Sequence, residues 1–479
     1  MIRRILTLGS LCCLLSVAPL WAQRDTLRIL SVNDMHANLE RMPRLAAVAD
    51  SLRAIDPDLI VLSAGDNRTG NPYNDRHEIA AYPMVALMNA IGFDATAVGN
   101  HEWDEGPEGL RRVANLASFP FLCCNVSAPD SLSLPIRPYA IRCVRGVRIG
   151  LLGALQTNQG GIPDSHPSKV KQLSFRKADE AIGDFAWLRE ACDYLILLSH
   201  DGYEADIVTA GRYPYFDQIV GGHTHTLAPA NDMHSGVLIT QAKNKVAYAN
   251  LTTIVVERGK VVSKTSEIID VAHFGRSNAD VEALVATFKK NAEMERVLTT
   301  VARPFQSREE LGNMVCDALL AGTGADIALQ NGGGVRYDSF PAGPMTVGDV
   351  LTLDPFGNEV VAFTMTGREV AAYIQQCYAY DEKQVPFVGG LCYTMTVDAD
   401  KSPISISLTN SDGTPFDLDK TYRLVTNSYV SAILPVPASG AGENTYVVAA
   451  DHIIRYLQQQ PSVDYQGTHR ATVIVQPKK

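Results

Sequence analysis

Apolar residues in the first half of the chain form short runs separated by amphipathic segments. Uninterrupted apolar runs predict strands that are buried on both faces. They occur at residues 27–32, 59–63, 95–98, 147–152, 194–199 and 218–220. Patterns typical of helices lie between several of them, at residues 42–55, 77–91 and 175–191. This alternation predicts an α/β fold, which a strand-rich section at residues 237–270 closes.

The pattern changes after residue 276. Residues 277–300 are rich in charge and contain no Gly or Pro, so they are predicted to form a linker helix. A second α/β unit is predicted over residues 301–479. Its signals are a helix around 311–320, a glycine-rich turn at 331–334 and strands at 360–365 and 422–426. We therefore expect two domains, at residues 23–276 and 301–479.

The first 22 residues have the composition of a secretory signal peptide. Arg3 and Arg4 precede an apolar run at residues 5–18, and Ala22 offers a cleavage point. An uncleaved anchor is the alternative, but the run is shorter than the roughly 20 residues that a membrane span requires. No later stretch of the sequence is apolar enough to span a bilayer. We expect secretion across the inner membrane, to the periplasm or the extracellular space.

Charge and cysteine content narrow the function classes. The formal net charge of −10 argues against a general basic surface that holds a nucleic-acid polymer. An anionic substrate therefore needs a local source of positive charge, such as metal ions or a few arginines. The seven cysteines after the signal segment include no CxxC pair, so a cysteine zinc site is not expected. A Cys377–Cys392 bridge and free thiols both remain open.

Candidate metal ligands recur where the predicted strands end. Because ligands collect at the carboxyl ends of strands in such folds, we expect these side chains to meet. Imidazole and carboxylate together suit Zn²⁺, Mn²⁺, Fe or Co²⁺ better than Ca²⁺. Two such cations, about 3.5–4 Å apart, can activate a water and clamp phosphoryl oxygens. The strand ends carry, in chain order, Asp34 and His36, Asp66, Asn100 with His101, His200, and His223 with His225.

The same residues resemble those of the calcineurin-like metallophosphatases. More narrowly, the chain is similar to the secreted 5′-nucleotidase, UDP-sugar hydrolase and 2′,3′-cyclic phosphodiesterase family, over essentially its whole length after the signal segment. The resemblance implies a four-layer α/β/β/α metallophosphatase sandwich. A smaller α/β C-terminal domain of the 5′-nucleotidase type, which binds the substrate, is expected to follow it.

The resemblance also implies a role for each residue of the metal constellation. One metal would be held by Asp34, His36, Asp66 and His225. The second would be held by Asp66, Asn100, His200 and His223, with Asp66 bridging the two. His101 would be catalytic and face the phosphate, and Asp104 would hold its imidazole.

The C-terminal half resembles the family's nucleotide-binding domain. Three glycines let the backbone approach a ligand closely, and an arginine can form bidentate hydrogen bonds with a phosphate. A phenylalanine ring offers a π face to a base. The alternative for these features alone is a turn with a surface arginine and a core phenylalanine. The resemblance implies that substrate is bound by Arg308, by Asn331, Gly333 and Arg336 of the Asn-Gly-Gly-Gly-Val-Arg segment, by Phe356 and Asn358 of the Pro-Phe-Gly-Asn loop, and by Tyr429.

Two segments depart from the family pattern. The family's Gly-Gly-Asp-Gly stretch, whose Asp contacts the ribose hydroxyls, is replaced here by residues 439–444. The sugar contact is therefore open, and Tyr446 is the alternative to Tyr429 as the second stacking aromatic. Lys243 stands where the family has Gly, and it either contacts phosphate or is solvated.

The expected function is a secreted dimetal phosphohydrolase that acts on nucleoside 5′-monophosphates, with UDP-sugars as further candidates. A 2′,3′-cyclic-nucleotide 2′-phosphodiesterase/3′-nucleotidase is the alternative enzyme, because the same residues suit a different ester. A nucleotide-binding protein with a degenerate site is the alternative outside enzymes, and the presence of every expected metal ligand argues against it. The sequence favours neither a monomer nor a dimer.

Overall fold

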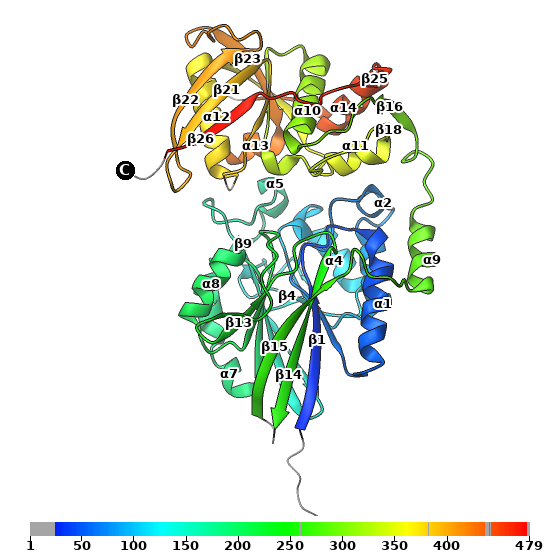
Figure 1. Ribbon diagram of the computed structural model, residues 1–479. Coiled ribbons are helices and arrows are strands. Elements are labelled where there is room, and N and C mark those ends of the chain that lie inside the picture. The colour runs from blue at the N-terminus through cyan, green and yellow to red at the C-terminus, as the bar shows by residue number, and fades with distance from the viewer. Residues whose placement is uncertain (1–23, 258–259, 382, 436–439, 441, 477–479) are drawn as a thin grey trace, which may run out of the picture.

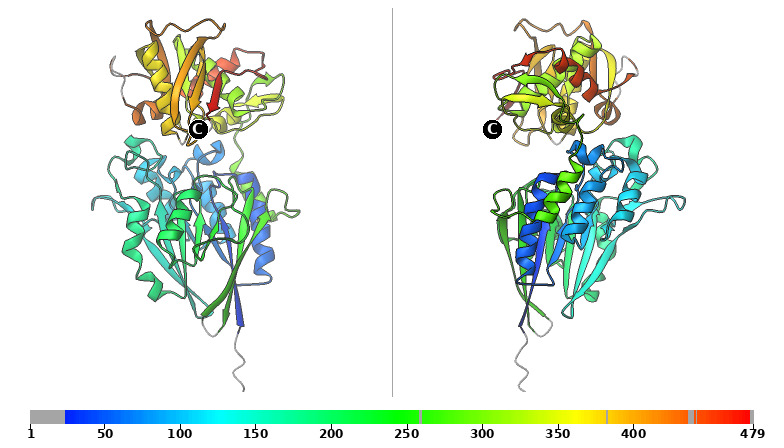
Figure 2. Two further views of the ribbon diagram at one scale, coloured as in Figure 1. Left: turned by 60° about the vertical axis from the view of Figure 1, so that its left-hand side comes forward. Right: turned by 90° about the vertical axis from the view of Figure 1, so that its right-hand side faces the viewer.

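The computed structural model of the protein describes residues 24–257, 260–381, 383–435, 440 and 442–476 (Figure 1). The signal peptide predicted at residues 1–22 lies outside the described residues. The chain forms an N-terminal body and a C-terminal body, which Figures 1 and 2 show stacked one above the other. Every helix in the described part of the chain is too short or too polar to cross a membrane.

Two β-sheets form the centre of the N-terminal body. The first has the strand order β15-β14-β1-β2-β3-β4-β6, with bounds Lys260–Asp270, Tyr248–Glu257, Arg24–Val32, Ile60–Ser63, Ala95–Ala97, Phe121–Leu122 and Ile136–Arg137. The second has the order β12-β13-β11-β10-β8-β7, with bounds Asp232–His234, Val237–Thr240, Gln218–Gly221, Tyr194–His200, Val147–Leu155 and Tyr139–Val144. β1 to β3 are parallel, as are β8, β10 and β11, so the carboxyl ends within each set share one edge.

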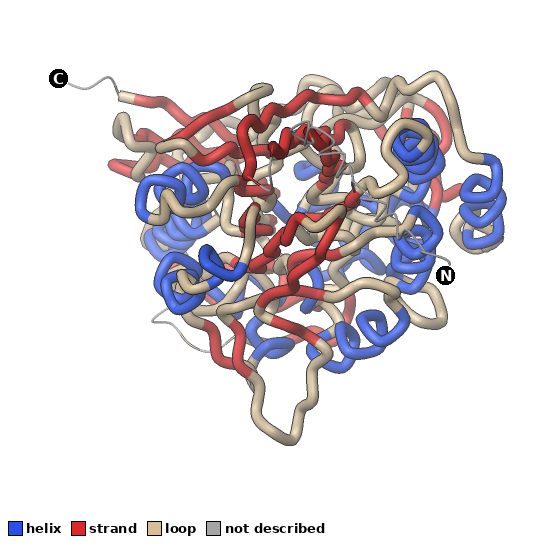
Figure 3. The backbone as a smooth tube through the Cα atoms, turned by 90° about the horizontal axis from the view of Figure 1, so that it is seen from below, coloured by secondary structure: helices blue, strands red, loops and turns tan. Residues whose placement is uncertain are grey.

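Three apolar clusters hold these elements together as successive layers. One cluster joins the inner faces of the two sheets, through residues such as Ile29 and Ile196. A second packs the outer face of the first sheet against α1 (Met42–Arg53), α3 (Tyr82–Ile91) and α4 (Gly106–Leu116). A third covers the second sheet with α6 (Ala178–Ala181), η3 (Ile182–Phe185), α7 (Leu188–Ala191) and α8 (Tyr203–Arg212). The predicted four-layer α/β/β/α sandwich is confirmed, and Figure 3 shows helices on the outside of the strands.

The C-terminal body is a smaller α/β unit, as predicted. Its main sheet has the order β20-β17-β23-β19-β24, with bounds Phe387–Gly389, Ile327–Gln330, Thr421–Asn427, Glu359–Thr366 and Glu443–Val448. α10 (Arg308–Thr323), α11 (Val347–Leu353) and α14 (Ala449–Gln458) pack on one face, and α12 (Gly367–Tyr380) packs on the other. The remaining elements of its described part are β22-β21-β26 (Pro403–Asn410, Leu391–Val397, Ala471–Val475), β18-β16-β25 (Gly343–Thr346, Val297–Val301, Ser462–Val463), the 3₁₀ turn η4 (Gly332–Gly334) and the short helix α13 (Ser428–Ile433).

The predicted linker helix is shorter than residues 277–300. α9 spans only Ala279–Phe288, begins after the Asn278 cap and packs against α1 and α3. Residues 297–301 instead form β16, which pairs with β18 and β25. Because this segment is rich in Val and Thr, the residue types that favour strands, the absence of Gly and Pro did not suffice to extend the helix.

Candidate metal centre and substrate cavity

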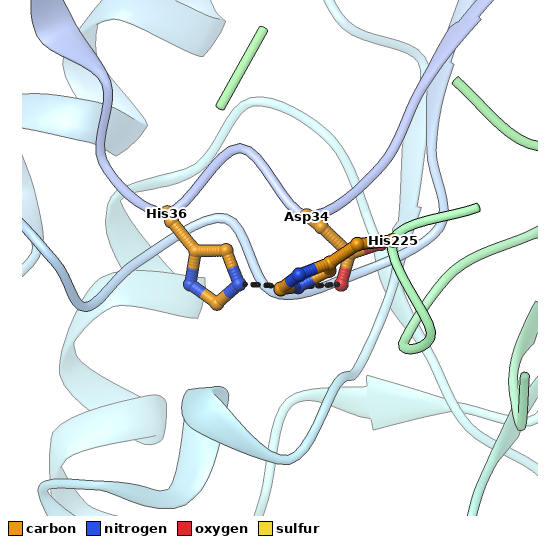
Figure 4. A group of neighbouring side chains, drawn as sticks. All are labelled: Asp34, His36 and His225. Carbon is orange, nitrogen blue, oxygen red and sulfur yellow. Dashed lines mark hydrogen bonds and ion pairs between the residues drawn. The ribbon is translucent and has the colours of Figure 1, made fainter. Parts of the chain in front are cut away.

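The predicted ligands of the first metal converge from separate strand ends. His36 Nε2 lies 3.0 Å from His225 Nε2, and His225 Nε2 lies 3.5 Å from Asp34 Oδ1. Figure 4 shows these three side chains pointing toward one another. Asp66 Oδ2 lies 3.9 Å from His36 Nε2, so all four side chains meet at one place.

The predicted ligands of the second metal adjoin the first group. His200 Nε2 lies 3.2 Å from Asp66 Oδ2 and 3.2 Å from Asn100 Oδ1. Asn100 Oδ1 in turn lies 3.1 Å from His223 Nδ1. Asp34, Asp66 and His200 also form a compact group that could hold a cation. The structure therefore brings the seven predicted metal ligands into one cluster. Which of the two metals each residue binds stays a prediction.

The backbone of this cluster is strained. Left-handed φ angles are uncommon for residues other than glycine and cost free energy. Strain of this kind gathers at functional sites, because it persists only where the surrounding structure enforces it. Five of the seven predicted ligands have positive φ: Asp34 (47°), His36 (45°), Asp66 (50°), His223 (76°) and His225 (55°).

Two glycines allow the ligand loops to touch. A Cβ at Gly65, where φ is +92°, would lie 2.7 Å from the backbone nitrogen of Gly99. A Cβ at Gly99 would lie 2.3 Å from Oδ1 of Asp66. Contacts this short do not occur, so both positions require glycine if Asp66 is to approach Asn100.

The protonation of His200 shows that the cluster fits a cation. His200 Nδ1 lies 2.7 Å from the carbonyl oxygen of Ala64 and therefore carries a proton. Nε2 then faces two oxygen acceptors, on Asp66 and Asn100, which repel its lone pair unless a proton or a metal ion lies between them. Burial lowers the pKa of His200, but the carboxylates of Asp66 and Asp34 and the Ala64 carbonyl together outweigh burial and raise the pKa to about 10. A buried site that holds positive charge so strongly is suited to divalent metal ions.

Glu102 holds the metal loops in place, a role that the sequence did not reveal. Its two carboxylate oxygens accept hydrogen bonds from the backbone nitrogens of Asp66, Asn67 and Gly99, at 3.0, 2.9 and 2.7 Å. The side chain is buried. The only sequence signal for Glu102 was its position in the Gly-Asn-His-Glu segment. Its hydrogen bonds to three backbone nitrogens cannot be predicted from that motif.

His101 is oriented as the predicted catalytic residue. Its Nδ1 lies 2.9 Å from Asp104 Oδ2, which also accepts a hydrogen bond from the Thr69 hydroxyl at 2.6 Å. Burial lowers the pKa of His101, but the carboxylates of Asp104 and Asp66 overcome burial, and the net pKa is raised. The protonated ring is thus favoured. His101 also forms a compact group with His36 and Asp66, so its role as acid rather than ligand requires a test.

One cavity of about 820 Å³ joins the metal cluster to the C-terminal body. The first body contributes Asp66, Asn100, His101, Asp104, His223 and His225 to its wall. The second contributes all of the predicted substrate-binding residues, Arg308, Asn331, Gly333, Arg336, Phe356, Asn358 and Tyr429. The structure places these residues together, and their individual roles stay predictions.

Two side chains of the second body lie directly against the metal cluster. The Phe356 ring stacks on the His101 ring with centroids 5.7 Å apart and an interplanar angle of 20°. Arg336 Nη2 lies 3.1 Å from His36 Nε2. Arg308 instead pairs with Asp338, at 2.5 Å, within the second body. A ligand in the cavity would therefore contact both bodies at once.

The structure also bears on the alternatives that the sequence left open. Tyr429 lines the cavity, whereas the side chain of Tyr446 is 81% exposed and lies outside the described cavity wall. Lys243 is exposed, whereas Lys245 lines the cavity and donates to the carbonyl oxygen of Arg336 at 2.8 Å. The seven described cysteines are all free thiols.

Several residues of the cavity wall were not predicted. The loop between β8 and α5 (Pro167–Val170) contributes Asp164 and His166, and α5 itself contributes Lys169. In the second body, Glu359 and Asp381 also face the cavity. These are isolated polar residues in loops or at the ends of elements, so neither periodicity nor a motif distinguishes them in the sequence.

Comparison with known proteins assigns the two bodies to families. Residues 27–227 match the calcineurin-like phosphoesterases, and residues 285–432 match the 5′-nucleotidase C-terminal domain. Protein UshA of Yersinia enterocolitica is 28% identical, and the match covers 96% of each chain. The trifunctional nucleotide phosphoesterase protein YfkN of Bacillus subtilis is 27% identical over 85% of this chain. That match covers only 32% of the length of YfkN.

A solved structure extends the likeness to the whole fold. The crystal structure of the 5′-nucleotidase precursor from Thermus thermophilus superposes with a TM-score of 0.83 at 26% sequence identity. The match covers 94% of this chain and 99% of that one, so both bodies and their order are shared. The chain is therefore a metal-dependent phosphoesterase of the family that joins a calcineurin-like phosphoesterase domain to a 5′-nucleotidase C-terminal domain.

Proposed function

We propose that the protein is a secreted 5′-nucleotidase that uses two divalent metal ions, from among Zn, Mn, Co and Fe. The observation that carries this proposal is the single cavity that holds the metal cluster, His101 and the predicted nucleotide-binding residues. The 5.7 Å contact between the Phe356 and His101 rings sets the expected base-binding side chain beside the expected catalytic one. A nucleoside monophosphate, with a base at one end and a phosphate at the other, matches this arrangement.

The metal ions would occupy the two ligand groups that share Asp66. When bound, they would activate a water molecule and neutralise charge on the phosphoryl oxygens. Donor types in the cluster support this, since imidazole and carboxylate ligands suit the four metals named. The ligands would be Asp34, His36, Asp66 and His225 for one ion, and Asp66, Asn100, His200 and His223 for the other.

The chain's own residues would bind the nucleotide and supply a proton. Arg336 would pair with the phosphate, and Phe356 and Tyr429 would hold the base. As water attacks the phosphorus and the bond to the 5′-oxygen breaks, protonated His101 would give its Nε2 proton to that oxygen. Asp104 would keep Nδ1 engaged, so that Nε2 faces the cavity. The products are a nucleoside and inorganic phosphate.

Hydrolysis of a substrate panel tests this function. Products would be separated by chromatography, because a cyclic nucleotide and a nucleotide sugar release no inorganic phosphate in their first hydrolysis. The protein would be stripped with a chelator, reloaded separately with each of the four metals, and given 5′-AMP, 3′-AMP, 2′,3′-cyclic AMP and UDP-glucose. We expect no hydrolysis without metal and the highest kcat/KM for 5′-AMP. Faster turnover of 3′-AMP or the cyclic nucleotide would favour the alternative enzyme. Nucleotide binding without hydrolysis of any of these substrates would contradict both.

Removal of the Phe356 ring is expected to weaken nucleotide binding. Stacking on an aromatic side chain contributes about 1–3 kcal/mol per base, so Phe356→Ala should raise KM for AMP roughly 10- to 100-fold. Turnover of a small aryl phosphate, measured in parallel, should change little. Tyr446→Ala removes an exposed aromatic side chain outside the cavity and serves as the control. Equal losses on both substrates would show that Phe356 supports His101 instead of a base.

A further inference from the structure

Asp381 joins two parts of the cavity wall that lie apart in the sequence. It follows α12, and its Oδ2 accepts a hydrogen bond from the backbone nitrogen of Gly333 at 3.0 Å. A Cβ on Gly333 would lie 3.3 Å from Asp381 Oδ1, so the missing side chain of Gly333 makes room for the carboxylate. The carboxylate also acts on Tyr429, whose pKa is raised mainly by burial and further by Asp164 and Asp381.

These neighbours place Asp381 beside the middle of a bound nucleotide. Gly333 lies three residues before Arg336, the side chain at the metal end of the cavity. Tyr429 lies at the expected base end. The sugar is covalently placed between phosphate and base, so a side chain that bridges these two regions faces the sugar. Asp381 is thus positioned to meet whatever hydroxyl groups the sugar carries.

The chemistry of a carboxylate suits a ribose diol. The 2′- and 3′-hydroxyl groups are adjacent donors, and an ionised carboxylate accepts through two oxygens with about four lone-pair sites. Hydrogen bonds to a charged acceptor are stronger than those between neutral groups. Asp381 would also remain fixed by Gly333, so little ordering is needed when a sugar binds.

Glu359 is the competing carboxylate of the second body. It lies next to Asn358, and its Oε2 accepts a hydrogen bond from Asn444 Nδ2 at 2.5 Å. It also lies near His166 of the first body, and its charge raises the pKa of that imidazole, although burial and Lys169 outweigh this effect and lower the pKa overall. Its backbone nitrogen also donates to the Ser428 hydroxyl at 3.2 Å, so Glu359 is joined to residues 428 and 444, whereas Asp381 is joined to Gly333. It provides a matched comparison for Asp381.

We infer that Asp381 is a specificity residue that accepts hydrogen bonds from the 2′- and 3′-hydroxyl groups of the nucleotide and makes the enzyme prefer ribonucleotides. The inference rests on the proposed 5′-nucleotidase activity. It concerns the part of the site where the family's Gly-Gly-Asp-Gly stretch is missing. The contact would come from a different element of the fold, the end of α12.

The test compares AMP with 2′,3′-dideoxy-AMP in four proteins: the unchanged chain, Asp381→Ala, Asp381→Asn and Glu359→Gln. We expect the unchanged chain to prefer AMP by about 10- to 100-fold in kcat/KM, the scale of hydrogen bonds to a charged group. This ratio should fall toward one in both Asp381 variants. It should stay within about threefold of the original in Glu359→Gln, well inside the roughly tenfold that one lost hydrogen bond to a charged group would cost.

Each outcome separates the inference from the function on which it rests. If Asp381 only supports the Gly333 loop, its variants lose activity on both nucleotides equally, and the unchanged ratio overturns the inference. Collapse of the ratio in Glu359→Gln alone assigns the sugar to Glu359 and also overturns it. If the unchanged chain hydrolyses an aryl phosphate but not AMP, the proposed function fails first, and the inference fails with it.

Discussion

Asp66→Asn is expected to lower kcat for nucleoside monophosphates by about 10³-fold or more. Asp66 is shared by two of the compact groups that could hold a cation, and its Oδ2 lies 3.2 Å from His200 and 3.9 Å from His36. An amide in its place removes the charge that would neutralise both metal ions. Metal ions contribute several kcal/mol to stabilisation of phosphoryl-transfer transition states, and each 1.36 kcal/mol corresponds to about tenfold in rate.

Bound metal and kcat should be measured together on the purified variant. We expect fewer than two metal ions per chain along with the loss of activity. Asp412→Asn serves as the control, because Asp412 bonds within its own exposed turn, to Thr414, and should change neither quantity. A variant of Asp66 that keeps both metals and a near-normal kcat would refute the bridging role.

The sandwich could be predicted because its strands are buried on both faces. Such strands appear in the sequence as unbroken apolar runs, and their carboxyl ends are marked by the polar residues that follow. β1, β2, β3, β8, β10 and β11 all fall on predicted runs. The shared edge of parallel strands then gathers ligands from distant segments, which is why the metal constellation could be located without a structure.

Two helices were predicted with the wrong extent, because their breaks depend on backbone geometry and packing that the local pattern does not show. The helix predicted at residues 77–91 begins only at Tyr82, because Ala81 adopts a left-handed φ of 67°. The helix predicted at 175–191 is divided into α6, η3 and α7. Each short piece is stabilised by the second sheet, through residues such as Ile182 and Leu188, instead of by its own length. Local patterns show the apolar face of such a segment but not where it breaks.

The residues of the substrate cavity also fall into two groups, those that a sequence motif identifies and those that only the fold identifies. Arg336 and Phe356 lie in short segments with glycine or proline beside them, so they stand out in the sequence. Asp164, Lys245 and Asp381 reach the cavity only because loops from both bodies close around it. Their residue types are common on protein surfaces, and only the three-dimensional arrangement shows that they face a ligand. Sequence motifs therefore locate the metal cluster and part of the substrate wall, whereas the other wall residues are found only in the folded chain.

His101→Ala is expected to separate acid catalysis from metal binding. His101 Nδ1 is held by Asp104 at 2.9 Å, and Nε2 lies 3.9 Å from Asp66 Oδ2. If His101 protonates the leaving 5′-oxygen, its removal should lower kcat for AMP by about 10²- to 10⁴-fold, while two metal ions stay bound. The loss should be clearly smaller for p-nitrophenyl phosphate, because its leaving group departs without a proton.

The comparison of the two substrates decides the role of His101. Metal content and kcat would be measured for both, with His273→Ala as the control, since the His273 side chain is 83% exposed and does not line the cavity. An equal loss on both substrates, together with loss of one metal ion, would make His101 a ligand in the group that it forms with His36 and Asp66. Retained metal with a loss that depends on the leaving group would establish it as the acid, because a ligand affects every ester alike.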